Sequence, residues 1–196
     1  MRRKTFDTLL TAGGAVITVI LIVAGALLMW GHNFANDNVR TQLAQQQITV
    51  PAKGSSALAS PEIGPYLNKY AGQVILSGPA AKAYADHFIA VHLSEMPYGG
   101  VYSKVSTAAQ AQPNNTHLAA LKTTVFQGTT LRGLLLEAYA FWEMGQIALV
   151  AAITSFIGAG LILVLSVVGF WHLRRVNADE ELLAGHMGIS QAAAAA

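Results

Sequence analysis

The hydrophobic residues of this chain are concentrated in two long stretches, one towards each end of the sequence. No Asp, Glu, Lys or Arg occurs within residues 8–36 or within residues 145–171. A helix that spans a bilayer needs about 20 mostly apolar residues, and both stretches exceed that length. The pattern therefore predicts two transmembrane helices, the first over about Leu9 to Trp30 and the second ending near Trp171.

The first stretch shares with secretory signal peptides a basic start followed by an apolar run. Arg2, Arg3 and Lys4 precede the run. However, the run is too long for an ordinary signal peptide, and its Ala24-Gly25-Ala26 triplet lies inside the run instead of after it. We therefore expect a retained first transmembrane helix.

Charged and aromatic residues at the ends of the two stretches predict their orientation in the plasma membrane. Basic residues flank the start of the first stretch and the end of the second, and such clusters favour the cytoplasmic side. Both termini are then cytoplasmic, and residues 31–144 are extracytoplasmic. Tryptophan settles at the headgroup level of a bilayer. The residues expected to anchor the two interfaces are Trp30, Trp142, Trp171, Arg174 and Arg175.

The segment between the two stretches has a mainly helical pattern. Residues 38–47 prolong the first span as a polar helix, whereas residues 48–51 and 73–76 read as short extended pieces. A helix after Pro79 has an apolar face, and further helices are expected over residues 102–110 and 116–127. The residues expected on the apolar face are Ala81, Tyr84, Ala85, Phe88, Val91 and His92.

A break is expected at Gly128, with a new helix capped by Thr129 or Thr130 and continuing into the second span. The predicted fold is an all-α membrane protein with two antiparallel transmembrane helices and a mainly helical extracytoplasmic domain. The expected divisions are residues 1–31 for the first span, 32–128 for the extracytoplasmic domain, 129–172 for the long second helix and 173–196 for a cytoplasmic tail. One or two helical turns are expected in that tail, around Asp179 to Leu183.

Composition excludes several classes of function. Only 11% of residues are charged, the net charge is +2, and the mean hydropathy is +0.43. The basic residues are scattered, which argues against nucleic acid as a partner. Because the chain has no cysteine, disulfides, thiolate metal sites and cysteine nucleophiles are all excluded.

One helix carries the strongest candidate for site chemistry. His92, Glu95 and Met96 are spaced so that all three could face one site. A His-x-x-Glu pair supplies only two metal ligands, and a metal ion needs at least one more donor. The alternative is an internal pair in which Glu95 satisfies a partly buried His92 imidazole. His87 and His117 do not complete a cluster, so the sequence predicts no catalytic residue, metal site or cofactor.

Small residues recur along both predicted spans and let another helix approach closely. Their frequency is also an ordinary property of membrane helices, and the sequence does not decide between these explanations. The residues of this candidate helix-packing interface are Gly13, Gly14, Thr18, Ala151, Ser155, Gly158 and Ala159.

Several segments, taken in order, resemble a family of small actinobacterial two-span membrane proteins. They begin with Gln42-Leu43-Ala44-Gln45-Gln46-Gln47-Ile48 and Pro51-Ala52-Lys53-Gly54, followed by Tyr70-Ala71-Gly72-Gln73. The later ones lie within residues 81–93 and 130–136. The resemblance implies an actinobacterial plasma membrane. Some members of the family carry an aromatic ring-opening dioxygenase label, but no segment of this chain offers an iron site.

Three functions remain open at this point. The first is a non-catalytic accessory subunit that stabilises or helps assemble a larger membrane enzyme, such as a membrane monooxygenase or a respiratory oxidase. Its partners would be the other integral membrane subunits and the lipid bilayer. The alternative is an extracytoplasmic ligand-binding or sensing protein. The third, an enzyme, lacks a convergent set of polar residues.

Overall fold

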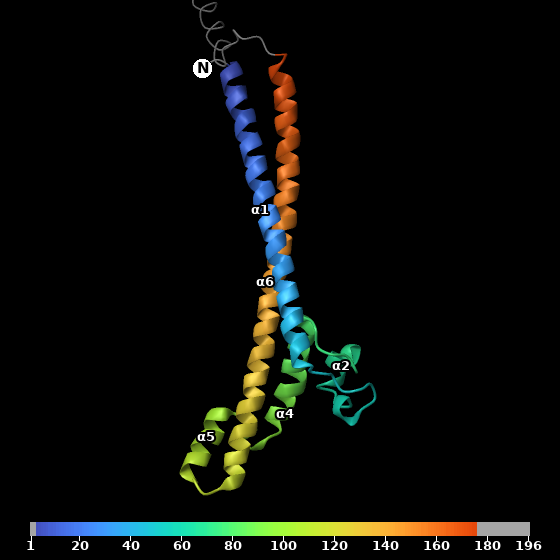
Figure 1. Cartoon of the computed structure of the whole chain (residues 1–196), viewed down its shortest axis with the longest axis vertical. Helices are drawn as coiled ribbons and strands as arrows, with labels where there is room; N and C mark the ends of the chain where they lie inside the picture. Colours follow the sequence, from blue (N-terminus) through green and yellow to red (C-terminus); the bar gives the residue numbers. More distant parts are fainter. Residues whose placement is uncertain (1–2, 176–196) are drawn as a thin grey trace, which may run out of the picture. The chain divides into compact units, whose positions relative to one another are not determined.

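The computed structural model describes residues 3–175, and within them every regular element is helical (Figure 1). The chain divides into two compact units. Unit 1 comprises residues 1–30 and 148–196, and unit 2 comprises residues 31–147. The α-helices are α1 (Arg3–Gln46), α2 (Gly64–Leu67), α3 (Gly78–Tyr84), α4 (Ala90–Ser94), α5 (Tyr102–Ala111) and α6 (Thr116–Leu173). The shorter turns are η1 (Ser56–Leu58), η2 (Asn68–Tyr70), η4 (Pro97–Gly100) and the π-helical η3 (Ala85–Ile89).

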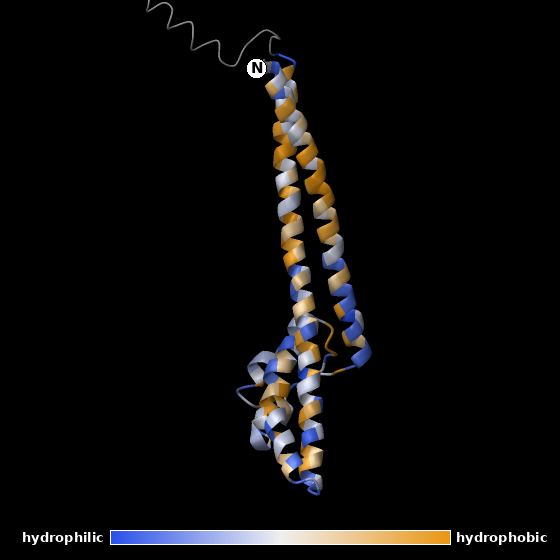
Figure 2. Ribbon diagram, turned by 90° about the vertical axis from the view of Figure 1, so that its left-hand side faces the viewer, coloured by the Kyte–Doolittle hydropathy of each residue, from blue (hydrophilic) through white to orange (hydrophobic). Residues whose placement is uncertain are grey.

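Helices α1 and α6 are both long and apolar enough to cross a membrane. Figure 2 shows that hydrophobic residues dominate their segments in unit 1, whereas hydrophilic residues recur along the helices of unit 2. These observations confirm the predicted all-helical class and the two long apolar helices. The continuation of the first apolar stretch into a polar helix is also confirmed, because α1 runs to Gln46. The helix is followed by Gln47, whose positive φ of 52° turns the chain away.

In unit 1 the two apolar segments lie side by side along a seam of mostly small residues (Figure 1). Thr11 lies beside Gly169, Gly14 beside Ser166 and Gly25 beside Phe156. The seam residues on both helices alternate three and four positions apart, which is the spacing of left-handed helix packing. They are Thr11, Gly14, Thr18, Leu21, Gly25 and Leu28 on α1, and Ala152, Ser155, Ala159, Ile162, Ser166 and Gly169 on α6.

Unit 2 has a hydrophobic core built around the first half of α6. Val125 and Leu135 of α6 are fully buried, together with Leu67 from α2 and Ala81 from α3. The two predicted extended pieces pair through a single antiparallel bridge between Thr49 and Val74, and no longer strand forms within residues 3–175. The short helices therefore depend on burial against α6 for their stability, since helices of this length are marginal alone.

The predicted helix start at Thr129 or Thr130 is wrong. The structure has one helix from Thr116 to Leu173. The Asn115 side chain caps it, because its Oδ1 accepts a hydrogen bond from the Leu118 N–H at 3.1 Å. Gly128 therefore lies inside the helix, where a Cβ would come within 2.9 Å of Leu93 Cδ2. Close packing against Leu93, and not a helix stop, accounts for this glycine.

The seam in unit 1 can be tested by a disulfide, since the chain has no native cysteine. A Cβ on Gly14 would lie 3.6 Å from Ser166 Cβ, within the range of about 3.5–4.5 Å that a disulfide requires. We expect Gly14→Cys combined with Ser166→Cys to crosslink rapidly in native membranes on mild oxidation, seen as a mobility shift in non-reducing electrophoresis. Gly13→Cys with Ser166→Cys is the control, because nothing lies within 4 Å of a Cβ on Gly13. Equal crosslinking of the two pairs would contradict the seam.

Candidate functional site

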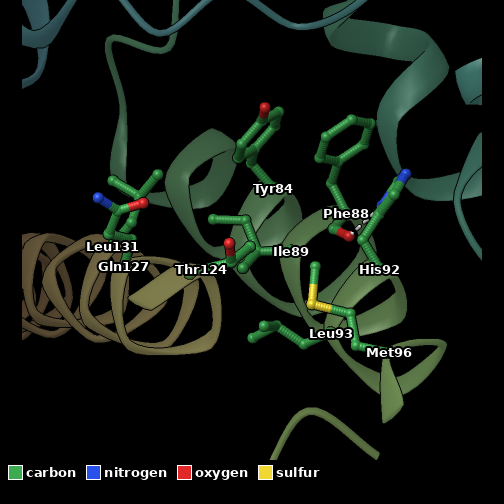
Figure 3. Close-up of a pocket in the computed structure, with 10 residues that line it drawn as sticks. Tyr84, Phe88, Ile89, His92, Leu93, Met96, Thr124, Gln127 and Leu131 are labelled. Atoms are coloured by element: carbon green, nitrogen blue, oxygen red, sulfur yellow. Dashed lines mark hydrogen bonds between the residues drawn. The ribbon is translucent and has the colours of Figure 1, made fainter. Parts of the chain in front are cut away.

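A cavity of unit 2 lies between the α3–η3–α4 segment and α6 (Figure 3). It has a volume of about 390 Å³ and is open to the surface. No Asp, Glu, Lys or Arg lines it. The lining residues are Tyr84, Phe88, Ile89, His92, Leu93, Met96, Thr124, Gln127, Gly128 and Leu131.

One wall of this cavity is a ladder of three rings spaced four residues apart. The Tyr84 and Phe88 rings are stacked, with centroids 4.6 Å apart and planes at 19°. The Phe88 and His92 rings follow at 4.4 Å and are tilted by 40°. Because Phe88 lies within the π-helical turn, where the helix is wider, rings at a spacing of four residues remain in line. Because the rings are stacked on one another, the ladder presents mainly ring edges to the cavity.

The opposite wall comes from one face of α6, where Thr124, Gln127, Gly128 and Leu131 follow helical spacing. The absence of a side chain at Gly128 lets α6 approach Leu93 of α4, which closes the cavity between the walls. Thr124 donates its hydroxyl to the Ala120 carbonyl at 3.2 Å, so its oxygen is left as an acceptor. This wall thus combines the apolar side chain of Leu131 with a hydroxyl and an amide.

The apolar face predicted for this helix is right in part. Ala81 and Ala85 are fully buried. His92, however, is exposed, and Ile89 and Leu93 take the buried positions. The π-helical turn explains this difference, because residues beyond it lie on a different face from the one that a regular α-helical period predicts.

The His92 ring is held by the backbone and not by Glu95. Its Nδ1 lies 2.7 Å from the Phe88 carbonyl oxygen, which can only accept, so Nδ1 carries the proton in this contact. In the neutral ring Nε2 is then an acceptor. Neither a metal ligand set nor the expected pair with Glu95 forms around His92 in the described part of the chain.

The other two histidines considered as ligands lie apart from the cavity. The His87 ring stacks on Tyr66 with centroids 3.4 Å apart. His117 is exposed in the first turn of α6. Within residues 3–175, no group of three His, Cys, Asp or Glu side chains is placed to hold a metal ion.

An ion-pair cluster ties α3 and η3 to α6 near the cavity. Asp86 accepts from Lys82 Nζ at 2.6 Å and from Arg132 at 2.9 Å. Partial burial acts to raise the pKa of Asp86, but the hydrogen bonds from Lys82 and Arg132 outweigh it, and the pKa is lowered overall. The four-residue spacing of Lys82 and Asp86 could have predicted their ion pair from the sequence, whereas nothing in the sequence pointed to Arg132 as a partner of Asp86.

Unit 2 also displays an exposed apolar surface, which we call the tip patch: Tyr98, Val101, Tyr102 and Phe126. Phe126 is 54% exposed, and its ring lies 5.6 Å from that of Tyr102. Tyr98 has a positive φ of 62°, which is uncommon for a residue other than glycine. The adjoining Gly99 and Gly100 share this left-handed conformation and set the tight turn that presents Tyr98.

Unit 1 shows where the predicted small-residue rows lie. Gly14 and Thr18 are in the seam on α1, whereas Gly13 faces away from it. On α6, Ser155 is half-buried and Ala159 is buried. Ala151 is only half-buried beside the fully buried Ala152, and Gly158 faces Leu21. The small residues on the seam therefore serve contact between α1 and α6.

The predicted anchor residues have different surroundings. Trp30 and Trp171 are exposed. Trp142 is half-buried in unit 2, where a Cβ on Gly78 would come within 2.5 Å of its Cβ. The guanidinium groups of Arg174 and Arg175 lie over the rings of Phe170 and Trp171, respectively. The tail around Asp179 to Leu183 lies outside the described residues.

Sequence reasoning missed a polar contact between α1 and α6 in unit 2. His32 Nδ1 donates to the Gly145 carbonyl oxygen at 2.8 Å. Gln146 Nε2 donates to Asn36 Oδ1 at 3.4 Å. The available signal was the four-residue spacing of His32 and Asn36 directly after an apolar run. A pattern of this kind indicates a polar stripe but not its partner.

Comparisons with protein-family models, curated proteins and solved structures gave no match. The geometry of the cavity, the tip patch and the seam therefore carries the functional argument.

The ion-pair cluster predicts a pH-dependent stability. Because the pKa of Asp86 is lowered by folding, its stabilisation is present above the ordinary aspartate value of about 3.9 and is lost as the pH falls through the lower folded value. We expect Asp86→Asn to reduce the free energy of unfolding by roughly 0.5–1.5 kcal/mol at neutral pH. As the pH falls below about 4, the difference in stability between wild type and variant should disappear. The measurement is the thermal midpoint in mild detergent against pH.

The matched control is Asp37→Asn, because Asp37 is exposed on α1 and has no ion pair among the described residues. If the thermal midpoint of Asp86→Asn stayed below that of wild type by the same amount from neutral pH to acid, packing or hydrogen bonding, and not charge, would be responsible.

Proposed function

We propose that this chain is a non-catalytic accessory subunit that stabilises or helps assemble a larger membrane enzyme complex. The observation that carries the proposal is the tip patch of unit 2. An apolar patch exposed on a water-facing domain often marks an interaction with another protein. Tyrosine and phenylalanine are also among the residues enriched at such interfaces.

The proposal places α1 and α6 in the plasma membrane as an antiparallel transmembrane pair, with unit 2 extracytoplasmic and both termini cytoplasmic. The length and apolar character of both helices support this placement. The large apolar side chains of unit 1 away from the seam are exposed, as expected for groups that face lipid or other membrane subunits. The resemblance to actinobacterial two-span proteins supports the same membrane.

The seam bears on where a host complex would bind. Its small residues already serve the contact between α1 and α6, so a host subunit would contact other surfaces. The outward apolar faces of unit 1 and the tip patch are those surfaces. Membrane monooxygenases and respiratory oxidases are the proposed host types, because both are assemblies of several integral membrane subunits.

The accessory role predicts that altering the tip patch releases the partner. We expect Phe126→Gln to lower recovery of stoichiometric host subunits by about 10-fold or more, since one interface aromatic often contributes 2 kcal/mol or more. The measurement is quantitative mass spectrometry of the tagged full chain, purified from native membranes in mild detergent. The host enzyme's activity and thermal stability should fall with it.

Val74→Gln is the matched control, because Val74 is an exposed apolar residue of unit 2 outside the tip patch. It should leave recovery unchanged. If deletion of the whole gene left every membrane complex intact and active, the accessory role would be excluded.

A ligand-binding or sensing role is the second candidate, and the cavity beside the ring ladder is the observation that favours it. Concave, mainly apolar sites with a few polar groups are typical of small-molecule binding. Purification of the protein distinguishes the two candidate functions, since the accessory role requires a stoichiometric protein partner and the ligand-binding role requires a bound small molecule.

The topology yields a separate prediction. A cysteine replacing Ser103, which is exposed on α5, should react with a membrane-impermeant maleimide in whole cells. One replacing Ser190 should react only after the membrane is permeabilised. The opposite pattern would place unit 2 in the cytoplasm.

A further inference from the structure

We propose that the cavity between the ring ladder and α6 binds an uncharged, planar aromatic compound of one or two rings that carries a hydroxyl group. This site goes beyond the accessory role and does not depend on it. The tip patch is the surface for a protein, whereas the cavity is lined by other residues and has different chemistry.

The charge of the ligand follows from the lining. No charged side chain faces the cavity, and a buried charge without a partner is costly. The nearest charged cluster does not line it, because Asp86 is already paired with Lys82 and Arg132. The lining therefore offers a carboxylate or an amine no ion-pair partner. The site thus favours a neutral molecule.

The shape of the ligand follows from the ring ladder. Tyr84, Phe88 and His92 form one wall from stacked and tilted rings, whose edges can make edge-to-face contact with a ligand ring. Met96 lies at the end of this wall, and its sulfur and methyl group pack well on aromatic rings. The volume of about 390 Å³ lies at the small end of ligand cavities. These features favour a flat molecule of one or two rings over a bulky saturated one.

The hydroxyl group follows from His92. Its Nδ1 donates to the Phe88 carbonyl at 2.7 Å, so in the neutral ring Nε2 is the remaining acceptor of this lining residue. Figure 3 shows this ring beside Phe88 and above Met96. The Thr124 hydroxyl likewise donates its hydrogen bond to the Ala120 carbonyl, which leaves the hydroxyl oxygen as a second acceptor. A ligand O–H is the complementary donor.

The test uses 2-naphthol as the probe and the full chain in lipid nanodiscs. The methionine methyl groups carry ¹³C, and the Met96 methyl signal reports ring-current shifts from a bound aromatic. We expect a saturable shift of Met96. Met29 of the apolar unit 1 segment and Met144 lie outside the cavity lining and report simple partition of the probe into lipid. A Met96 shift that rose without saturation, in parallel with Met29, would overturn the site.

Three related probes define the ligand class. The methyl ether 2-methoxynaphthalene lacks the donor, 2-naphthoate carries a charge, and 2-decalol keeps the hydroxyl but is saturated and not planar. Each should bind more weakly than 2-naphthol. Equal or tighter binding of 2-naphthoate or 2-decalol would overturn the assignment of a neutral planar ligand.

Two variants locate the site. Thr124→Trp should fill the cavity and abolish the saturable shift, whereas Thr123→Trp should not. The pair is matched, because each threonine is exposed and donates to the carbonyl four residues earlier at 3.2 Å, but only Thr124 lines the cavity. Equal behaviour of the two variants would contradict this location.

His92→Phe keeps the ring ladder and removes the acceptor, so it tests the hydroxyl without filling the cavity. It should weaken 2-naphthol by roughly 3- to 10-fold, the effect of one hydrogen bond, and leave 2-methoxynaphthalene unchanged. An unchanged preference for 2-naphthol over its ether would refute the role of His92. Loss of the tip-patch partner would leave these binding results unaffected. The experiments therefore test the ligand site and the accessory role independently.

Discussion

How closely other segments can approach α6 is the constraint on which the fold of this chain depends. For unit 1, the proposed membrane placement offers no hydrophobic gain when an apolar helix leaves lipid, so association there relies on dispersion between well-fitted surfaces. Gly14 and Gly25 let α6 side chains come against the backbone of α1. In unit 2 the gain comes from burial instead, but contact is equally close, since Gly78 accommodates Trp142 and Gly128 accommodates Leu93. Close approach at a glycine is therefore common to both units.

This constraint changes how the small residues are interpreted. From the sequence, Ala151, Ser155 and Ala159 form a row that any neighbouring helix could occupy. In the structure the buried row begins one position later than this predicted row, because Ala152, and not Ala151, is fully buried. The alternating spacing of three and four residues follows the contact between α1 and α6 better than a uniform spacing of four does. The neighbour of this row is thus within the chain, and proposals for other subunits concern other surfaces.

Much of the fold could be predicted because hydrophobic pattern and turn residues agree over long segments. The extents of α1 and α5, and the turn before Thr116, follow from local sequence. The continuity of α6 through Gly128 could not be predicted, since a glycine there reads as a stop until Leu93 is known to lie against it. The π-helical turn at Ala85–Ile89 was equally invisible to a search for an ordinary helical period, and it moved His92 out of the expected buried face. The partnership of Asp86 with Arg132 depends on tertiary contact, which no local pattern encodes.

The cavity and the tip patch each combine residues of α6 with residues of the segment 84–102. Met96 ends the cavity wall, and its carbonyl accepts a hydrogen bond from the Gly99 N–H at 3.0 Å. A Cβ on Gly100 would overlap the Leu93 carbonyl, so the left-handed turn that presents Tyr98 rests directly on the cavity floor. Glycine is required there for both its conformation and its size. The geometry of the turn is thus fixed by the same residue, Leu93, that closes the cavity against Gly128, and neither surface can be repositioned without the other.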